Sequence, residues 1–321
     1  MRFPRASSSL IYNFRHFEPS SHTMPFSPRT VLRGASNLRT FSTTHRLLRP
    51  DLSFQVFGPE KDQPTHNPIV FLHGLFGSKQ NNRTISRALA RDLKRQVYVV
   101  DLRNHGNSFH DPDHNYHAMA DDVAEFIHEH KLRKCVLIGH SMGAKTAMTV
   151  ALNAPDLVSA LVPVDNAPVS AVLRTDFAKY VRGMQHVEAA NVTKQSDAEK
   201  ILQDYEEALP IRQFLLTNLV RSQEDQTMKF RVPLSILGDS LREMGDFPFG
   251  EPGSVQYKGP TLVVRGTKSP YVSDETFPAI RGFFPNSRVV DVEAGHWVIS
   301  ENPEAFRKGK SAYPTGCQGT V

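Results

Sequence analysis

The fold of this chain is decided by the stretch Cys135-Val136-Leu137-Ile138-Gly139-His140-Ser141-Met142-Gly143. Residues 135–138 form an apolar run typical of a buried strand, and residues 144–152 have the pattern of a helix. A serine between them lies on a strained strand-to-helix turn that pushes its Oγ into solvent, and flanking glycines let strand and helix approach closely. The stretch therefore predicts that Ser141 is a nucleophile, although three fixed residues also recur by chance.

Two further segments supply the groups that a nucleophilic serine needs. Residues 68–72 read as a buried strand that runs into a glycine-rich loop at 73–77. Such a loop supplies one backbone N–H of an oxyanion hole, and the residue after the nucleophile supplies the other. We therefore expect the amides of Leu75 and Met142 to hold the oxyanion. Downstream, His296 follows a strand at 287–292 and is the expected general base.

The order of nucleophile before histidine is that of the α/β-hydrolases. From about residue 52 to residue 307 the chain resembles this superfamily. Three segments also resemble one group of this superfamily, the mitochondrial abhydrolase-domain esterase-like group, which includes fungal ethanol-acetyltransferase-like enzymes. These segments are Asp101-Leu102-Arg103-Asn104-His105-Gly106, Val164-Asp165-Asn166-Ala167-Pro168 and Gly295-His296-Trp297. The resemblance implies an α/β fold with a mostly parallel central sheet, helices on both faces and an inserted helical cap.

Hydrophobic periodicity indicates the same architecture. Short apolar runs alternate with segments of helical period, which implies β-α-β units and a sheet buried on both faces. We expect strands at 52–57, 68–72, 97–101, 135–139, 160–165, 261–266 and 287–292, and helices at 84–94, 117–131, 142–153 and 274–284. The strand signal stops between Asp165 and Thr261, where helical spacing predicts a cap at about 169–256.

The charge-relay acid is the least obvious member of the site. In most α/β-hydrolases it follows the strand that corresponds to 261–266, but here Ser269 stands where an aspartate is expected. The end of the preceding strand offers Asp165, at the sheet edge where ligands bind. An aspartate in this setting plays the relay role in the resembling group, so we assign the role to Asp165, with Asp274 and Asp239 as alternatives. The other interpretation of Asp165 is a residue that caps the turn after its strand.

Charge is distributed unevenly along the 321 residues. Residues 1–50 hold eight arginines and one acid, a net charge of +7, so the rest of the chain carries −2 of the total of +5. A leader that is rich in arginine and serine and poor in acids is typical of a mitochondrial transit peptide. We expect import into the matrix, with cleavage between Phe41 and Ser42; the alternative is an N-terminus without structure. The excess of positive charge lies in this leader and not in the rest of the chain, so no nucleic-acid partner is expected.

The chain is therefore divided into a transit peptide at 1–48, a hydrolase domain at 49–308 and an irregular tail at 309–321. No apolar run approaches the roughly 18 residues of a membrane span. The two cysteines, Cys135 and Cys317, lack metal-ligand spacing, so neither a metal nor another cofactor is expected. The sequence does not indicate an oligomeric state.

The leading functional hypothesis is acyl transfer from an ester, a thioester or an acyl-CoA through an acyl-serine. Water as the acceptor gives an esterase or thioesterase, and an alcohol gives an acyltransferase. A serine at position 141 argues against an epoxide or haloalkane hydrolase, which needs aspartate there. The alternative from another class is a ligand-binding or scaffold protein on a hydrolase frame, because fold does not dictate function.

Overall fold

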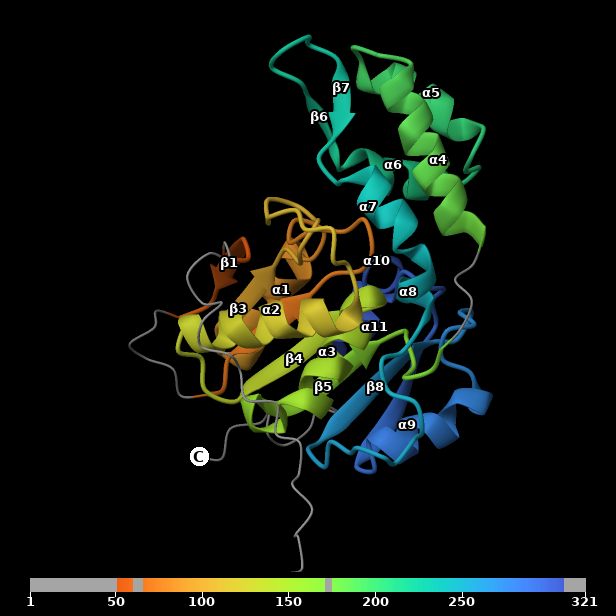
Figure 1. Cartoon of the computed structure of the whole chain (residues 1–321). Coiled ribbons are helices and arrows are strands. Elements are labelled where there is room, and N and C mark those ends of the chain that lie inside the picture. Colours follow the sequence, from red (N-terminus) through yellow and green to blue (C-terminus); the bar gives the residue numbers. More distant parts are fainter. Residues whose placement is uncertain (1–50, 60–65, 171–174, 309–321) are drawn as a thin grey trace, which may run out of the picture. The chain divides into compact units, whose positions relative to one another are not determined.

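A seven-stranded sheet forms the centre of the molecule (Figure 1). The computed structural model describes residues 51–59, 66–170 and 175–308, all within one compact unit. The strand order is β1-β3-β2-β4-β5-β8-β9. β1 pairs antiparallel with β3, and the other pairs are parallel. The bounds are β1 Phe54–Phe57, β2 Ile69–Leu72, β3 Val97–Val100, β4 Cys135–His140, β5 Val158–Val164, β8 Thr261–Gly266 and β9 Ser287–Val292.

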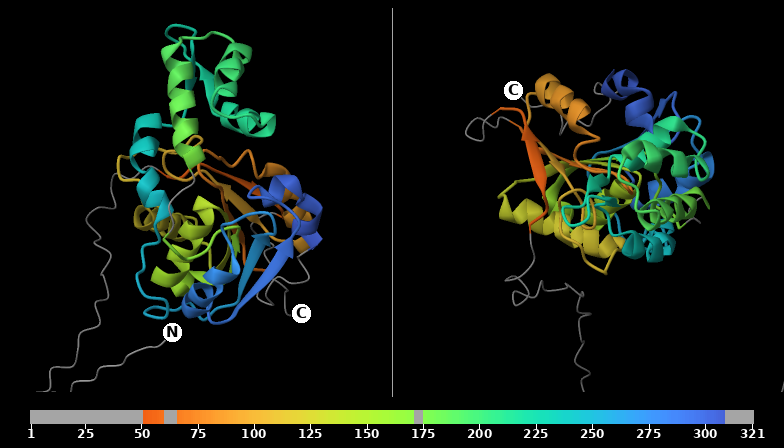
Figure 2. Two further views of the ribbon diagram at one scale, coloured as in Figure 1. Left: turned by 90° about the vertical axis from the view of Figure 1, so that its right-hand side faces the viewer. Right: turned by 90° about the horizontal axis from the view of Figure 1, so that it is seen from above.

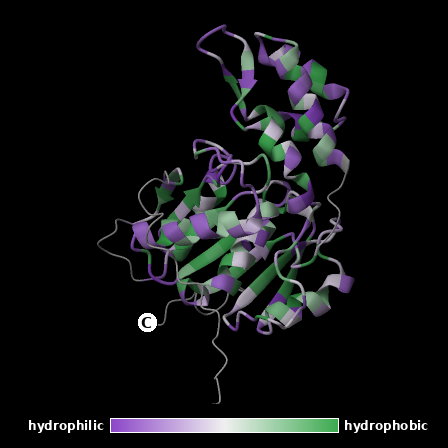
Figure 3. Ribbon diagram, viewed as in Figure 1, coloured by the Kyte–Doolittle hydropathy of each residue, from purple (hydrophilic) through white to green (hydrophobic). Residues whose placement is uncertain are grey.

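Each of the seven strands lies where an apolar run predicts it. The mostly parallel sheet is thus confirmed, and its central strands β2, β3 and β4 are buried along their whole length. Figure 3 shows these strands as hydrophobic ribbons between helices with mixed surfaces. This pattern is expected where both faces of a parallel sheet are covered.

Helices cover both faces of the sheet (Figure 2). On one face, α1 (Arg83–Leu93), α10 (Val298–Glu301) and α11 (Pro303–Lys308) bury Ile85, Leu89, Val298 and Phe306 against the strands. On the other face lie α2 (Tyr116–Glu129) and α3 (Met142–Asn153), whose core also takes in Phe283 of α9 (Phe277–Phe283). The predicted helix at 274–284 begins as a 3₁₀ turn, Asp274–Thr276, before α9.

The chain between β5 and β8 forms an insertion, defined here as residues 175–245. It contains α4 Thr175–Ala189, α5 Gln195–Gln203, α6 Leu209–Leu216, β6 Leu219–Arg221, β7 Met228–Phe230, α7 Leu234–Asp239 and α8 Leu241–Gly245. The antiparallel pair β6–β7 was not predicted, because three-residue strands are too short to show an alternating pattern. Asn218 of the insertion donates a hydrogen bond to the carbonyl oxygen of Phe76 in the loop after β2, at 2.7 Å.

Candidate active site

Ser141 lies on the sharp turn between β4 and α3. Its φ and ψ angles, 54° and −116°, fall in a region that residues with a side chain rarely occupy. The turn also requires glycine on both sides. A Cβ on Gly139 would meet the carbonyl oxygen of Gly143 at 2.0 Å, and one on Gly143 would meet that of His73 at 2.5 Å. The backbone therefore places Ser141 at the N-terminus of α3 under strain.

A chain of hydrogen bonds joins the three side chains that the sequence singled out. His296, in the loop between β9 and α10, has its Nε2 2.9 Å from Ser141 Oγ and its Nδ1 2.7 Å from Asp165 Oδ2. Because a carboxylate only accepts hydrogen bonds, Nδ1 carries the proton and Nε2 accepts from the serine hydroxyl. Such an arrangement lets the imidazole take the serine proton while the carboxylate stabilises the imidazolium.

Asp165 follows β5 and is fully buried. Its Oδ1 accepts a hydrogen bond from the Gly266 amide at 3.0 Å, and its Oδ2 accepts one from the Ser269 hydroxyl at 2.5 Å. A buried carboxylate needs such donors because it has lost its hydration. Ser269, which stands where the family resemblance implies an aspartate, thus donates a hydrogen bond to the Asp165 carboxylate. Sequence reasoning marked this position but did not predict the contact.

The two alternative acids lie elsewhere. Asp274 pairs with Arg265 at 2.7 Å, and 80% of its side chain is exposed. Asp239 ends α7 and is also exposed. Within the described part of the chain, neither is hydrogen-bonded to His296.

The loop after β2 lies directly against Ser141, since a Cβ on Gly74 would meet the serine Cβ at 3.2 Å. The next residue is Leu75, and Met142 is the first residue of α3. Among the hydrogen bonds of the described residues, neither of their two amides acts as a donor. The amide of Met142 also belongs to the positive end of the helix dipole. Within the described part of the chain, neither N–H group thus has a hydrogen-bond acceptor.

Two buried histidines order this loop. His73 Nδ1 donates to the carbonyl oxygen of Gly74 at 2.8 Å, and its Nε2 accepts from the Leu102 amide at 3.0 Å. His105 Nε2 accepts from the Phe76 amide at 3.1 Å. Burial lowers the pKa of both histidines. Both rings are therefore neutral near pH 7, as accepting nitrogens require.

His140 and Tyr271 surround the His296 ring, with ring centroids 5.1 and 4.2 Å from it. His140 Nε2 donates to the carbonyl oxygen of His296 at 2.7 Å. Burial lowers the pKa of His140 to about 4, so this ring is neutral at pH 7. The contact fixes the loop that carries His296, and sequence reasoning missed it because it depends on a side-chain direction that only tertiary packing sets.

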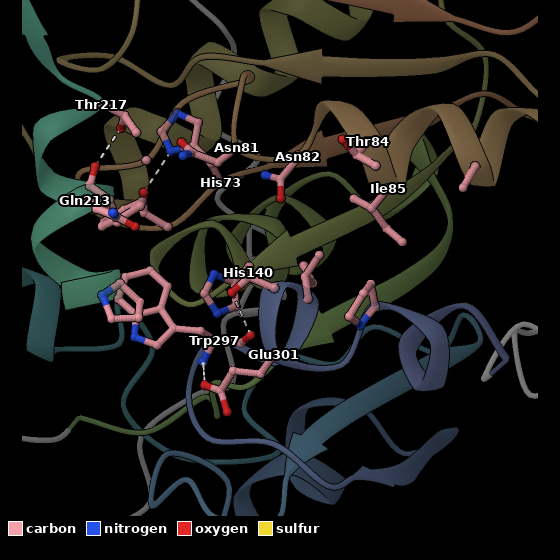
Figure 4. Close-up of a pocket in the computed structure, with 18 of the residues that line it drawn as sticks. His73, Asn81, Asn82, Thr84, Ile85, His140, Gln213, Thr217, Trp297 and Glu301 are labelled. Carbon is pink, nitrogen blue, oxygen red and sulfur yellow. Dashed lines mark hydrogen bonds between the residues drawn. The ribbon is translucent and has the colours of Figure 1, made fainter. Parts of the chain in front are cut away.

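A groove of about 1120 Å³ lies between α1, α6 and α10–α11 (Figure 4), and Gly74 of the loop after β2 is part of its lining. Thr84 and Ile85 of α1 lie on one side, and Gln213 and Thr217 on the side of α6. His140 and Trp297 lie between them, with the Trp297 ring centroid 4.6 Å from that of Phe214. The insertion therefore contributes a wall to this groove.

Other kinds of site are not found in the described part of the chain. No group of three histidine, cysteine or acidic side chains there is placed to hold a metal ion. None of the helices between residues 51 and 308 that the structure describes has the length and apolar character needed to cross a bilayer. The proposed transit peptide and the tail at 309–321 lie outside the described residues.

The chain belongs to the α/β-hydrolase fold family, whose sequence model matches residues 67–303. It is 44% identical to the sn-1-specific diacylglycerol lipase ABHD11 of Xenopus laevis over 84% of this chain and 86% of the relative. It is 40% identical to a probable alcohol acetyltransferase of Saccharomyces cerevisiae, over 74% and 73%. Among solved structures, a marine microorganism esterase matches with a TM-score of 0.75 and 29% identity, over 82% of this chain and 99% of that one.

Proposed function

We propose that this protein is an acyl-transfer enzyme in which Ser141 is the nucleophile, His296 the general base and Asp165 the charge-relay acid. The continuous hydrogen-bonded path from Asp165 through His296 to a strained Ser141 carries the proposal. The broader class, an ester-acting serine hydrolase or acyltransferase, rests on the family and on relatives that are named as lipases and acetyltransferases.

The geometry supports a two-step reaction. Ser141 Oγ attacks the carbonyl carbon of an ester or thioester while His296 Nε2 takes its proton. The amides of Leu75 and Met142 stabilise the oxyanion of the tetrahedral intermediate. Its collapse expels the alcohol or thiol, which takes the proton from His296, and leaves an acyl-serine. A second acceptor then attacks the acyl-serine with His296 again acting as the base.

The acceptor is water in a hydrolase and an alcohol in an acyltransferase. Relatives of both kinds are about equally similar to this chain, at 44% and 40% identity, so we propose that both acceptors compete for the acyl-serine. An acyl-CoA is a thioester, so it can also donate its acyl group to Ser141. The acceptor that wins depends on how the site around Ser141 holds an alcohol against bulk water.

One experiment tests both the reaction and the acceptor. With 4-nitrophenyl acetate, rapid mixing should give a burst of 4-nitrophenol close to one per enzyme, followed by slower turnover. Ethanol should raise the turnover rate and yield ethyl acetate. Acid without ethyl ester at any ethanol concentration would leave a plain hydrolase, and no release beyond that of Ser141→Ala would leave the ligand-binding alternative.

We also propose that the protein acts in mitochondria. The support is the sequence of residues 1–50 alone, with its eight arginines, single acid and many serines. The mature chain would then begin near Ser42, before the first described residue.

A further inference from the structure

Asn218 connects the insertion to the loop that carries Leu75, one of the two expected oxyanion donors. It is buried between the end of α6 and the start of β6. Its Nδ2 donates to the carbonyl oxygen of Phe76 at 2.7 Å, and the carbonyl oxygen of Leu215 lies 3.5 Å from the same nitrogen. Because both neighbouring atoms are acceptors, the NH₂ group of the amide faces the loop.

The hydrogen bond to Phe76 reaches the Leu75 amide through two peptide groups. The Phe76 carbonyl and the Gly77 N–H belong to the first, and this N–H donates to the Gly74 carbonyl oxygen at 2.9 Å. The Gly74 carbonyl and the Leu75 N–H belong to the second. In a planar trans peptide group the C=O and the N–H point in opposite directions. A continuous path therefore runs from the Asn218 amide to the Leu75 N–H.

Hydrogen bonds in such a series strengthen one another. A donor at a carbonyl oxygen polarises the peptide group, which makes its N–H a better donor, by about 10–30% per bond. His73 Nδ1 is a second donor to the Gly74 carbonyl oxygen, at 2.8 Å. This peptide group lies against the nucleophile, since a Cβ on Gly74 would meet the Ser141 Cβ at 3.2 Å. The series thus ends on an N–H that can donate to the oxyanion formed at Ser141.

Phe76 depends on this support because its backbone is strained. Its φ is 59°, in the left-handed region that a bulky side chain disfavours, and its side chain is fully buried. Its N–H donates to His105 Nε2 at 3.1 Å. In the described part of the chain, Asn218 alone donates to its carbonyl oxygen. A buried carbonyl without a donor is unfavourable, so loss of this bond favours rotation of the peptide group between Phe76 and Gly77.

We propose that Asn218 is a positioning residue of the oxyanion hole. Through the two peptide groups it aligns and polarises the Leu75 N–H, which stabilises the tetrahedral intermediate. The insertion therefore takes part in the reaction, and Ser141 is fully reactive only while Asn218 holds the loop after β2. The inference rests on the proposed function, because it assumes acyl transfer at Ser141 with the Leu75 amide as an oxyanion donor.

The test compares 4-nitrophenyl acetate with its thionoester, in which sulfur replaces the carbonyl oxygen. Sulfur accepts hydrogen bonds weakly, so the thionoester gains little from the oxyanion hole. Asn218→Leu has a side chain of similar size without a donor. Its kcat for the ester should fall about tenfold, part of the roughly 10²–10³-fold cost of losing an entire oxyanion donor. KM should change by less than about twofold, because the bond to the oxyanion forms only in the transition state.

With the thionoester, the kcat of Asn218→Leu should fall by less than about threefold. Asn218→Ala is a second variant for the case that leucine prevents folding, and circular dichroism with thermal melting checks both. Ser240→Ala is the matched control, since it removes another hydrogen bond of the insertion, from a buried hydroxyl to the Ile236 carbonyl oxygen at 2.8 Å. It should keep the wild-type kcat with both substrates.

Two results would overturn the role of Asn218. One is a folded Asn218 variant with the wild-type kcat for the ester. The other is an equal loss with ester and thionoester, because a general disturbance of the site does not distinguish oxygen from sulfur. Failure of the proposed function looks different, since the wild-type protein itself would then cleave neither substrate faster than Ser141→Ala.

Discussion

Asp165 has both an unusual backbone conformation and a fully buried carboxylate. Its backbone has a φ of 51°, in the left-handed region, and its side chain is fully buried among three donors. Aspartate tolerates this backbone better than most residues. The left-handed turn directs the carboxylate to His296 from the end of β5. Ser269 donates to Oδ2, the oxygen that also pairs with His296, and the Gly266 amide donates to Oδ1.

Asp165→Asn should leave the fold intact and lower kcat by up to about 10⁴-fold. An amide in place of the carboxylate no longer favours the proton on Nδ1 of His296, so the ring loses the tautomer that accepts the serine proton. Steady-state kinetics with a short ester, alongside circular dichroism, measures this. The matched control is Asp274→Asn, which removes an exposed ion pair with Arg265 and should keep wild-type turnover. Normal turnover in a folded Asp165→Asn protein would move the relay role to another acid.

The sequence predicts the three residues that lie together in the candidate site, but not every hydrogen bond that holds them in place. Ser141, Asp165 and His296 each follow a strand whose end can be read from apolar runs, and parallel strands bring such ends to one edge. The hydrogen bond from His140 to the His296 carbonyl oxygen has no such signal. It depends on the direction of a ring that is set by neighbours distant in sequence.

Among the elements, α3 does more than carry Ser141. One turn after the serine, the buried Lys145 ammonium donates to three carbonyl oxygens: those of Val169, Gly245 and Asp246, at 3.0, 2.8 and 2.8 Å. Val169 lies before the insertion, and the other two lie at its end. Burial lowers the pKa of Lys145 to about 8, so at pH 7 most molecules keep the three donors. This side chain therefore ties both ends of the insertion to the nucleophile helix.

Lys145→Met should loosen the insertion and destabilise the protein by about 3 kcal/mol, because it leaves buried carbonyl groups without a donor. In thermal melting this corresponds to a drop of roughly 6–12 °C for a domain of this size. Limited proteolysis should show faster cleavage within residues 175–245. Lys179→Met, at an exposed position of α4, should change stability by less than about 0.5 kcal/mol. Equal melting and cleavage in the two variants would refute the role of Lys145.

Element prediction succeeded where periodicity extends over several residues. The strands of the main sheet and the long helices α1, α2 and α3 each bury a continuous face, which leaves a regular pattern in the sequence. The pair β6–β7 has three residues in each strand, which is too short for a regular pattern to show in the sequence. The chain between the two strands includes Gln226, whose φ is 62°.

At the scale of the whole molecule, the groove could not be predicted from sequence. Its walls come from α1, α6 and α10–α11, which lie more than 200 residues apart at the extremes. Periodicity indicates that each helix has an apolar face, but not the space left between three of them. The insertion provides one wall of the groove through α6, where Phe214 packs against Trp297.

The leader provides a prediction at the same scale. Residues 1–50 fused to a fluorescent protein should enter mitochondria and be shortened near Phe41, because an arginine-rich, acid-poor segment is driven across the inner membrane by its charge. Microscopy and mass spectrometry of the purified fusion measure both effects. The same segment with its eight arginines changed to glutamine should stay in the cytosol. Diffuse signal from a full-length wild-type fusion would argue against import.

The central claim is that Ser141 forms the covalent acyl-enzyme, and a fluorophosphonate probe tests it most directly. This probe reacts with a serine only where a base removes its proton and amides hold the oxyanion. Peptide mapping of the wild-type protein should find one adduct, on Ser141, and His296→Ala should lower the labelling rate strongly. Ser141→Ala should not be labelled at all. Labelling of Ser141→Ala at the wild-type rate, or an adduct mapped to another residue, would contradict this assignment.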